Sequence, residues 1–269
     1  MTAGASWVCL MYHDVSAEPA GVTGGSAFFS VSAATFGAQL SALRDAGLRG
    51  GSIAHILRDG ARGAVAISFD DGDLGQATRA FPALVAHGMT ATFFVTTSWV
   101  GRPGYASWEQ IQEMHAAGMS IQSHSHTHPF LSELEEEPLR DELRRSRDLL
   151  SEHLSERPSM LALPGGDAPR ASLRRVLAEE GYEVVATSRW GRNPASSPST
   201  PLYVRRCTVR GEPTLAEFSA IARGDRWLSV RKRARESVLA AIRSSLGPTT
   251  YAKLRRGVLN AARGRDSAR

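Results

Sequence analysis

The sequence lacks the features that mark membrane-spanning and disulfide-rich secreted proteins. No apolar run approaches the ~20 residues that a transmembrane helix needs. Only two cysteines occur in 269 residues, Cys9 and Cys207, and each lies in an apolar, strand-like context. We therefore expect small core side chains rather than a disulfide or a metal site there. The first residues, Met1–Ser6, have no basic stretch of the kind that opens a secretory signal, so a cytoplasmic location is expected.

What is present is an ordinary globular composition with an uneven distribution of charge. The hydrophobic fraction is 42% and the charged fraction 22%. Residues 226–269 carry twelve Lys or Arg and two Asp or Glu, which gives +10, whereas residues 1–225 carry 20 basic and 25 acidic side chains, which gives −5. We predict a folded domain over residues 1–225 and a basic amphipathic C-terminal extension over residues 226–269.

Strand-like and helix-like stretches alternate along the first 225 residues. The predicted strands are 7–12, 64–69, 90–95, 119–123, 160–163, 183–187 and 203–209. The predicted helices are 33–46, 76–87, 108–117, 135–153, 173–180 and 214–222, and 193–201 is a predicted loop. Such interleaving indicates an α/β fold with a parallel sheet, and the repetition favours a (β/α) barrel over a doubly wound sheet.

Carboxylates follow one of these strands and imidazoles follow another. Asp70-Asp71-Gly72 comes directly after strand 64–69, and three histidines lie within His124–His128 after strand 119–123. Chemistry in α/β proteins collects at the carboxyl ends of strands, so the two stretches are expected to meet. Of two adjacent carboxylates, one can bind a cation while the other remains free as a base. The alternative for each stretch is an ordinary polar turn.

The spacing of the histidines leaves the ligand pair open. In a turn or helical start His124 and His128 share a face, whereas an extended chain would pair His126 with one of them. Pro129 disfavours the helical region for His128, so a tight turn is the better interpretation. Two imidazoles and one carboxylate form a divalent metal site that leaves positions open for water and substrate.

Together these residues resemble a known family. Ser68-Phe69-Asp70-Asp71-Gly72 with His124-Ser125-x-x-His128-Pro129 is similar to the NodB-type polysaccharide deacetylases, carbohydrate esterase family 4. The resemblance covers about residues 7–223 and includes Leu10-Met11-Tyr12-His13 followed by Phe36-x-x-Gln39-Leu40. It implies a distorted (β/α)7-type barrel and a hydrolase of carbon–nitrogen bonds other than peptide bonds. The implied reaction removes the N-acetyl group of an amino sugar in a polysaccharide or in a lipid- or nucleotide-linked glycan precursor.

The resemblance also implies roles for individual residues. Asp71, His124 and His128 would bind a divalent metal, with Zn²⁺ expected and Co²⁺ or Ni²⁺ as alternatives. Asp70 matches the general base that takes a proton from the attacking water. His126 is the variable middle of its motif and is not assigned to the metal.

Two elements of the family pattern are missing. The stretch 161–166 has no arginine before Pro164-Gly165, so we make Arg206 the candidate that orients Asp70, with a surface charge as the alternative. The late Leu-x-His motif, the usual source of the general acid, is also absent, and His13 at the end of the first strand is our candidate for that role.

Substrate contacts are predicted at the ends of later strands. Trp190 falls roughly where the family has a pocket-wall tryptophan, and Pro164 and Gly165 belong to the family's third motif. We expect these three residues to contact the glycan. A core or loop-anchoring role is the alternative for Trp190.

The basic extension suggests a partner of its own. Apolar residues at helical spacing mix with Arg231-Lys232-Arg233, which is typical of a helix that binds an anionic membrane surface or an acidic partner. No specific nucleic acid is expected, because no recognised binding motif is present. We therefore expect a cytoplasmic protein whose extension binds the inner membrane face. The alternative is that the extension is simply solvated.

Two alternatives to a glycan deacetylase stay open. One is a related hydrolase acting on a non-peptide amide or a cyclic imide. The other is a non-catalytic glycan-binding module, which the missing arginine and late histidine would suit.

Overall fold

The computed structural model describes residues 6–17, 29–167, 170–195 and 201–225, together with Leu228 and Val230. Contacts divide the chain into two units, Met1–Asp225 and Arg226–Arg269. The predicted basic helix therefore lies outside the described residues, apart from those two positions.

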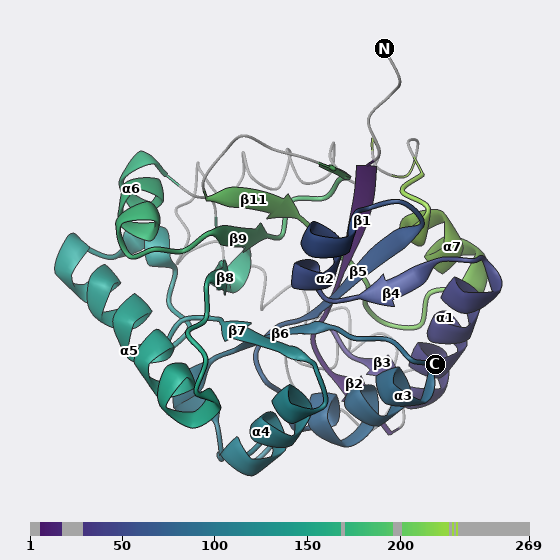
Figure 1. Cartoon of the computed structure of the whole chain (residues 1–269), viewed down its shortest axis with the longest axis horizontal. Helices are drawn as coiled ribbons and strands as arrows, with labels where there is room; N and C mark the ends of the chain where they lie inside the picture. Colours follow the sequence, from purple (N-terminus) through teal and green to yellow (C-terminus); the bar gives the residue numbers. More distant parts are fainter. Residues whose placement is uncertain are drawn as a thin grey trace, which may run out of the picture. The chain divides into compact units, whose positions relative to one another are not determined.

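Strands and helices alternate through the first unit (Figure 1). The strands are β1 (Ser6–Tyr12), β2 (Val15–Ser16), β3 (Val31–Ser32), β4 (Arg49–Gly51), β5 (Ala64–Phe69), β6 (Thr92–Val95), β7 (Ser120–Ser123), β8 (Met160–Ala162), β9 (Val184–Thr187), β10 (Asn193–Pro194), β11 (Leu202–Arg205) and β12 (Cys207–Thr208). The helices are α1 (Ala33–Asp45), α2 (Ile53–Asp59), α3 (Phe81–Ala86), α4 (Trp108–Ala116), α5 (Glu136–Leu154), α6 (Ala171–Glu179) and α7 (Leu215–Ala222).

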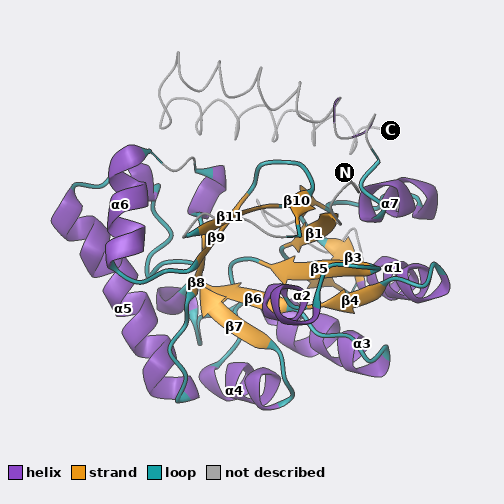
Figure 2. Ribbon diagram, turned by 45° about the horizontal axis from the view of Figure 1, so that its top comes forward, coloured by secondary structure: helices purple, strands orange, loops and turns teal. Residues whose placement is uncertain are grey.

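The main sheet curls into a nearly closed barrel. Strands β1, β5, β6, β7, β8, β9 and β11 neighbour one another in chain order, and β12 returns to pair in parallel with β1. Only Arg206 separates β11 from β12, so one short stretch joins both edges of the sheet. Helices α4, α5 and α6 lie outside the strands (Figure 2). The predicted distorted (β/α)7-type barrel is confirmed.

Alternation along the strands separates the inside of the barrel from its outside. Small residues such as Cys9, Ala66 and Ala162 belong to an inner cluster, which α2 closes with Ile53 and Ile56. The intervening strand residues pack outward against α5 and α6; this outer cluster includes Leu139, Leu143, Leu161, Leu173, Val176, Leu177 and Val185. Strands buried on both faces are continuously apolar, which is why the sequence revealed them.

Several predicted boundaries need correction. The predicted loop 193–201 begins with β10, which pairs antiparallel with β1 at Ser6 and Trp7. The predicted strand 203–209 is interrupted at Arg206, and helix 76–87 begins as a π-helical turn over Gln76–Ala80 before α3. Strand β4 was not predicted, because it is only three residues long and two of them are glycines. Helix α2, which follows it, was not predicted either.

Two expectations drawn from absences can be compared with the structure. Cys9 and Cys207 are both buried, as expected of core side chains. None of the helices among the described residues is long and apolar enough to cross a membrane.

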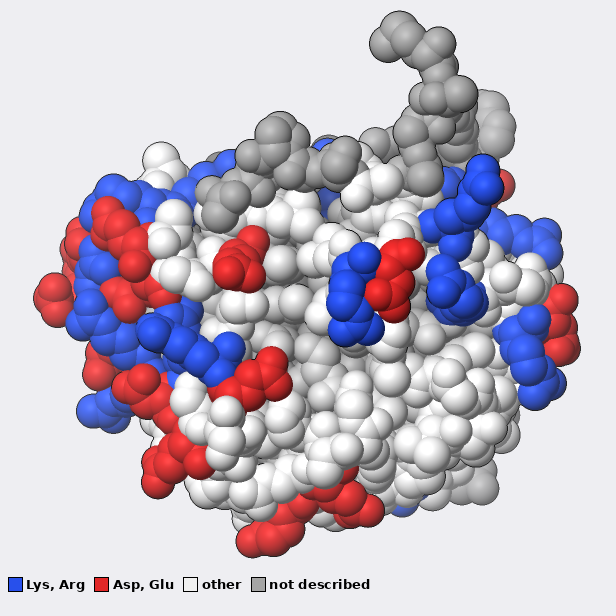
Figure 3. Space-filling view, viewed as in Figure 1, with Lys and Arg blue, Asp and Glu red and all other residues white. Residues whose placement is uncertain are grey.

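Charged side chains of both signs gather over α5 and α6 on the face shown in Figure 3. Arg140 of α5 forms ion pairs with Glu136 of the same helix and with Glu179 and Glu180 at the end of α6. Single exposed pairs contribute little, but a network shared between two helices holds them in register. Helix α5 is therefore tied to α6 on its outer side.

Gly75 marks a close approach of backbones beside the barrel's carboxyl-end loops. A Cβ atom there would lie 2.2 Å from the Val15 carbonyl oxygen and 2.2 Å from Asp14 Oδ1. We expect Gly75→Ala to lower the free energy of unfolding by about 1–3 kcal/mol or more, because the carbonyl cannot rotate away. In the control Gly37→Ala, nothing lies within 4 Å of the new Cβ, so stability in urea should hold or rise. Equal urea midpoints for Gly75→Ala and wild type would contradict this packing.

Candidate metal centre and active site

The two motifs meet at the carboxyl end of the barrel. Asp71 follows β5, and His124 and His128 follow β7, and their potential ligand atoms all lie within 4.8 Å of one another. Asp71 Oδ1 lies 3.3 Å from His124 Nε2 and 3.4 Å from His128 Nε2. The structure thus brings together the three residues that the sequence proposes as metal ligands.

The donor set fits a divalent cation. Asp71 Oδ1 is buried and accepts no hydrogen bond, although two imidazoles face it. His124 Nδ1 is 3.0 Å from the Ala162 carbonyl oxygen, to which it must donate, and this leaves a lone pair on Nε2. Burial tends to raise the pKa of Asp71, but the ring nitrogens of His124 and His128 hold it well below its usual range. Burial tends to lower the pKa of His124, but the charges of Asp70 and Asp71 raise it, so a cation that binds Nε2 would displace a proton from this ring. The ligand set would then be an ionised carboxylate and two neutral imidazoles.

A tight turn places the two histidine ligands together. Ser125 and His128 both have φ near +64°, the left-handed region, which costs a residue other than glycine about 1 kcal/mol or more. The turn is closed by the His128 N–H, which donates to Ser125 Oγ at 3.0 Å. The spacing left His124/His128 and the pairs with His126 open, and this turn selects His124/His128.

His126 points elsewhere. Its Nδ1 is 2.9 Å from Thr97 Oγ1, on the loop after β6, and it does not belong to the Asp71 cluster. This placement agrees with leaving His126 off the metal.

Asp70 lies beside the cluster and is held by Arg206. Arg206 Nη1 donates to Asp70 Oδ1 at 2.5 Å and Nη2 donates to Oδ2 at 2.7 Å, while Nε donates to the Thr187 carbonyl oxygen at 3.1 Å. Asp70 is 3% exposed and Arg206 is 0% exposed, so the surface-charge alternative does not hold. Burial tends to raise the pKa of Asp70, but the Arg206 charge outweighs it and the pKa is lowered.

His13 follows β1 next to this pair. Its Nδ1 is buried and makes no hydrogen bond, and its ring packs on Phe29 with centroids 4.5 Å apart. Burial lowers the pKa of His13, although the charges of Asp71 and Asp70 oppose that shift. Gln76, which the sequence did not single out, donates from Nε2 to the carbonyl oxygens of His13 at 2.9 Å and Asp70 at 2.5 Å.

The predicted substrate residues also lie at strand ends. Pro164 and Gly165 form a short helical turn after β8, with Gly165 at φ 64°, and Trp190 follows β9. Trp190 is only 4% exposed, so its ring presents little surface to a ligand. Trp99 lies closer to the cluster: its ring stacks on His128 with centroids 5.0 Å apart.

Asp73 adds a carboxyl group near the metal cluster. Burial, together with the charges of Asp71 and Asp14, raises its pKa to about 8. Its backbone pairs with that of Tyr105, and the ring centroid of Tyr105 lies 5.0 Å from that of Trp99. The spacing of residues in the sequence predicted neither the pairing of Asp73 with Tyr105 nor the contact between Tyr105 and Trp99.

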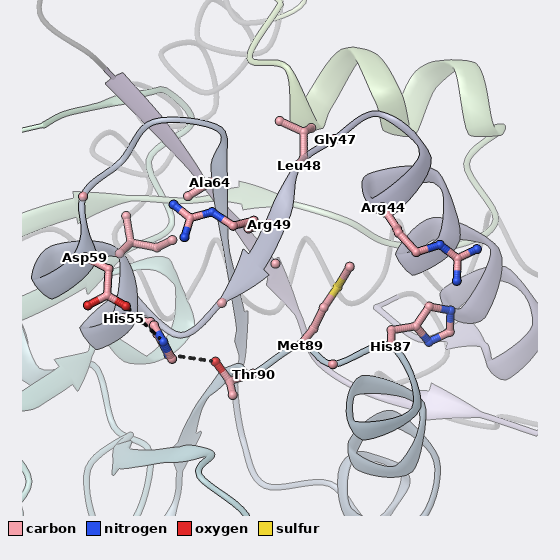
Figure 4. A pocket seen from close by; sticks show the side chains of 15 residues that line it. Arg44, Gly47, Leu48, Arg49, His55, Asp59, Ala64, His87, Met89 and Thr90 are labelled. Atoms are coloured by element: carbon pink, nitrogen blue, oxygen red, sulfur yellow. Dashed lines mark hydrogen bonds and ion pairs between the residues drawn. The ribbon is translucent and has the colours of Figure 1, made fainter.

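A separate pocket lies at the other end of the barrel, beside the first residue of β5 and the segment before β6 (Figure 4). There His55 pairs with Asp59 at 3.1 Å and approaches Thr90 Oγ1 at 3.4 Å. None of the predicted site residues lines this pocket.

Metal binding should depend on the three clustered residues. We expect Asp71→Ala and His128→Ala to lose bound metal, because each removes one of three ligands. His126→Ala is the matched control and should retain it, because that ring bonds to Thr97 instead. Elemental analysis of purified variants measures the metal-to-protein ratio. Equal ratios in all three variants would contradict the cluster as the metal site.

The buried ion pair should carry much of the local stability. Arg206→Met leaves the Asp70 carboxylate buried without its cation, and we expect a loss of about 3–5 kcal/mol in the free energy of unfolding. The double variant Asp70→Asn/Arg206→Met removes both charges and should recover part of that loss. Urea denaturation at neutral pH measures both, and a loss under 1 kcal/mol for Arg206→Met would argue against a structural role for the pair.

Comparisons with known proteins agree with this site. Residues 58–185 match the family model described as polysaccharide deacetylase. YxkH of Bacillus subtilis (strain 168), named as a polysaccharide deacetylase, is 29% identical over 127 residues, which cover 47% of this chain and 45% of that protein. The chain thus spans about half the length of this curated relative.

Solved structures share the fold over most of the chain. IcaB from Ammonifex degensii is 26% identical with a TM-score of 0.69, covering 82% of this chain and 98% of that one. The Streptococcus pyogenes deacetylase PplD in complex with acetate is 22% identical with a TM-score of 0.72, covering 82% and 99%. Residues 58–185, which carry both motifs, thus match the polysaccharide deacetylase family, and the barrel has the fold of these solved structures.

Proposed function

We propose that this protein is a metal-dependent hydrolase that removes the N-acetyl group of an amino sugar in a polysaccharide or in a lipid- or nucleotide-linked glycan precursor. The observation that carries the proposal is the convergence of Asp71, His124 and His128 beside an Asp70 that Arg206 holds ionised. The match of residues 58–185 to the polysaccharide deacetylase family model supports a deacetylase.

The metal proposed is Zn²⁺, with Co²⁺ or Ni²⁺ as alternatives. Two imidazole nitrogens and one carboxylate oxygen suit a borderline cation of this kind and leave positions open for other ligands. When bound, such an ion polarises a carbonyl group and makes a coordinated water more acidic.

The chain's own residues then divide the proton transfers. Arg206 fixes both oxygens of Asp70 and lowers its pKa, so the carboxylate is ionised and oriented to take a proton from the attacking water. His13 is the proposed donor to the leaving amine. Because burial lowers its pKa, the ring starts neutral near pH 7, so the proton that Asp70 takes from the water would have to reach His13 before His13 protonates the leaving amine.

Substrate contacts are proposed at Pro164 and Gly165, as the sequence suggests, whereas the burial of Trp190 favours a core or loop-anchoring role for its ring. Trp99 is a further aromatic ring beside the ligand His128. Aromatic faces of this kind pack well against the apolar C–H face of a sugar ring.

One of the two alternatives loses some of its support. A non-catalytic module was suggested by a missing arginine and a missing late histidine, but Arg206 supplies the guanidinium contact to Asp70. A hydrolase of a small amide or cyclic imide would use the same groups, so only substrate tests separate it from a glycan deacetylase.

The basic extension and the location of the protein stay predictions. Residues 226–269 lie outside the described residues except for Leu228 and Val230. Binding of this segment to an anionic membrane face or acidic partner, and a cytoplasmic location, rest on the sequence alone.

Acetate release from N-acetylglucosamine oligomers tests the proposed function on the full chain. We expect release that stops with a chelator and returns with Zn²⁺, Co²⁺ or Ni²⁺. Asp70→Asn should lower kcat roughly 10²–10⁴-fold through loss of the base while keeping its metal. Small amides and cyclic imides are assayed in parallel.

Two outcomes would contradict the proposal. Binding of the oligomers without turnover in the metal-loaded protein would indicate a non-catalytic module. Turnover confined to the amides or imides would indicate the related hydrolase.

A further inference from the structure

Glu142 of α5 contacts the turn that carries both histidine ligands. Its Oε2 accepts hydrogen bonds from the His126 N–H at 3.0 Å and the Thr127 N–H at 2.8 Å, and its Oε1 accepts one from Thr127 Oγ1 at 2.5 Å. Hydrogen bonds to an ionised acceptor are the stronger kind, and three of them converge here on one side chain.

The turn needs such external support. Two of its residues, Ser125 and His128, adopt positive φ, and its only internal side-chain bond is the one from the His128 N–H to Ser125 Oγ. The N–H groups of residues 126 and 127 lie midway between the ligands His124 and His128. Fixing these two groups therefore helps to fix the span between the two imidazoles, together with the Thr97 N–H, which donates to the Ser125 carbonyl oxygen at 3.3 Å, and the Ser98 N–H, which donates to that of His126 at 2.9 Å.

Helix α5 supplies a second contact one turn further along. Ser146 Oγ is 2.8 Å from Ser123 Oγ, which in turn accepts from the Ser125 N–H at 3.2 Å. Glu142 and Ser146 are four residues apart and so share one face of the helix. That face therefore contacts the turn at its start and at its middle.

The carboxylate of Glu142 bonds to the turn rather than to a basic side chain. Other glutamates at this end of the domain, such as Glu136 and Glu180, pair with arginines, whereas no Lys or Arg of the described ranges forms an ion pair with Glu142. Because the ion pairs of Arg140 hold α5 against α6, the position of the Glu142 carboxylate on α5 is fixed.

We propose that Glu142 is a positioning residue of the metal centre, which sets the separation and aim of the His124 and His128 ring nitrogens. The proposal rests on the proposed function in that the metal is the one assigned to that enzyme. Groups that orient metal ligands from behind typically change metal affinity 10–100-fold when removed.

Zn²⁺ affinity of the full chain, measured by competition with a chelating dye, tests this without any substrate. We expect Glu142→Met to bind Zn²⁺ roughly 10–100-fold more weakly than wild type. Glu142→Gln keeps an oxygen that can accept from both backbone N–H groups, so it should stay within about threefold of wild type. Glu152→Met is the matched control on the same helix, at an exposed position, and should bind as wild type does.

The visible spectrum of the Co²⁺-loaded protein gives a second readout, because it reports ligand geometry rather than stability. We expect the bands of Glu142→Met to shift or broaden and those of Glu142→Gln to match wild type. If circular dichroism shows that Glu142→Met does not fold, Thr127→Val takes its place. It removes only the hydroxyl bond and should weaken Zn²⁺ binding about two- to tenfold.

The outcomes separate this inference from the proposed function. Wild type that binds none of Zn²⁺, Co²⁺ and Ni²⁺ would overturn both. Wild type that binds Zn²⁺, with folded Glu142→Met equal to it, would overturn the role of Glu142 alone. A loss in Glu142→Gln as large as in Glu142→Met would also overturn it, because hydrogen-bond acceptance would then not be the cause.

Discussion

The buried ion pair between Asp70 and Arg206 is the constraint on which the rest of the site depends. Neither charge could be buried alone, since an unpaired ion in the interior costs several kcal/mol. Arg206 lies between β11 and β12, where the barrel closes on β1, and it also donates to the Thr187 carbonyl oxygen at the end of β9. Arg206 therefore orients the Asp70 carboxylate at the same place where the barrel closes.

This pair explains how two adjacent aspartates can differ in role. Like charges side by side resist joint ionisation unless each has its own compensation. Asp70 has the guanidinium of Arg206, and Asp71, with φ near 80°, turns its carboxylate toward the imidazoles of His124 and His128. The left-handed conformation of Asp71 separates the two environments, so one carboxylate faces the cation site and its neighbour stays off it.

The sequence alone predicted the barrel and the meeting of the two motifs, because both follow from buried strands whose ends converge. The continuously apolar runs gave the barrel, and Asp71 and His124 meet because their strands end at the same rim. The spacing of the histidines alone left open which imidazoles pair, because that depends on a positive φ at Ser125 that serine does not signal, and the family resemblance assigned His124 and His128. Gln76 and Glu142 were missed for another reason: their contacts arise from the packing of separate segments and leave no spacing in the sequence.

The missing family motifs can be understood from the same geometry. In a barrel every strand ends at one rim, so a functional group can reach the site from any strand whose register is right. Arg206 approaches Asp70 from the closing strand, in place of an arginine before Pro164. His13 is brought level with Asp70 by the pairing of Tyr12 with Phe69, and the Asp70 N–H donates to the Tyr12 carbonyl oxygen at 3.1 Å. The site therefore depends on which groups share the rim, and their order along the chain is secondary.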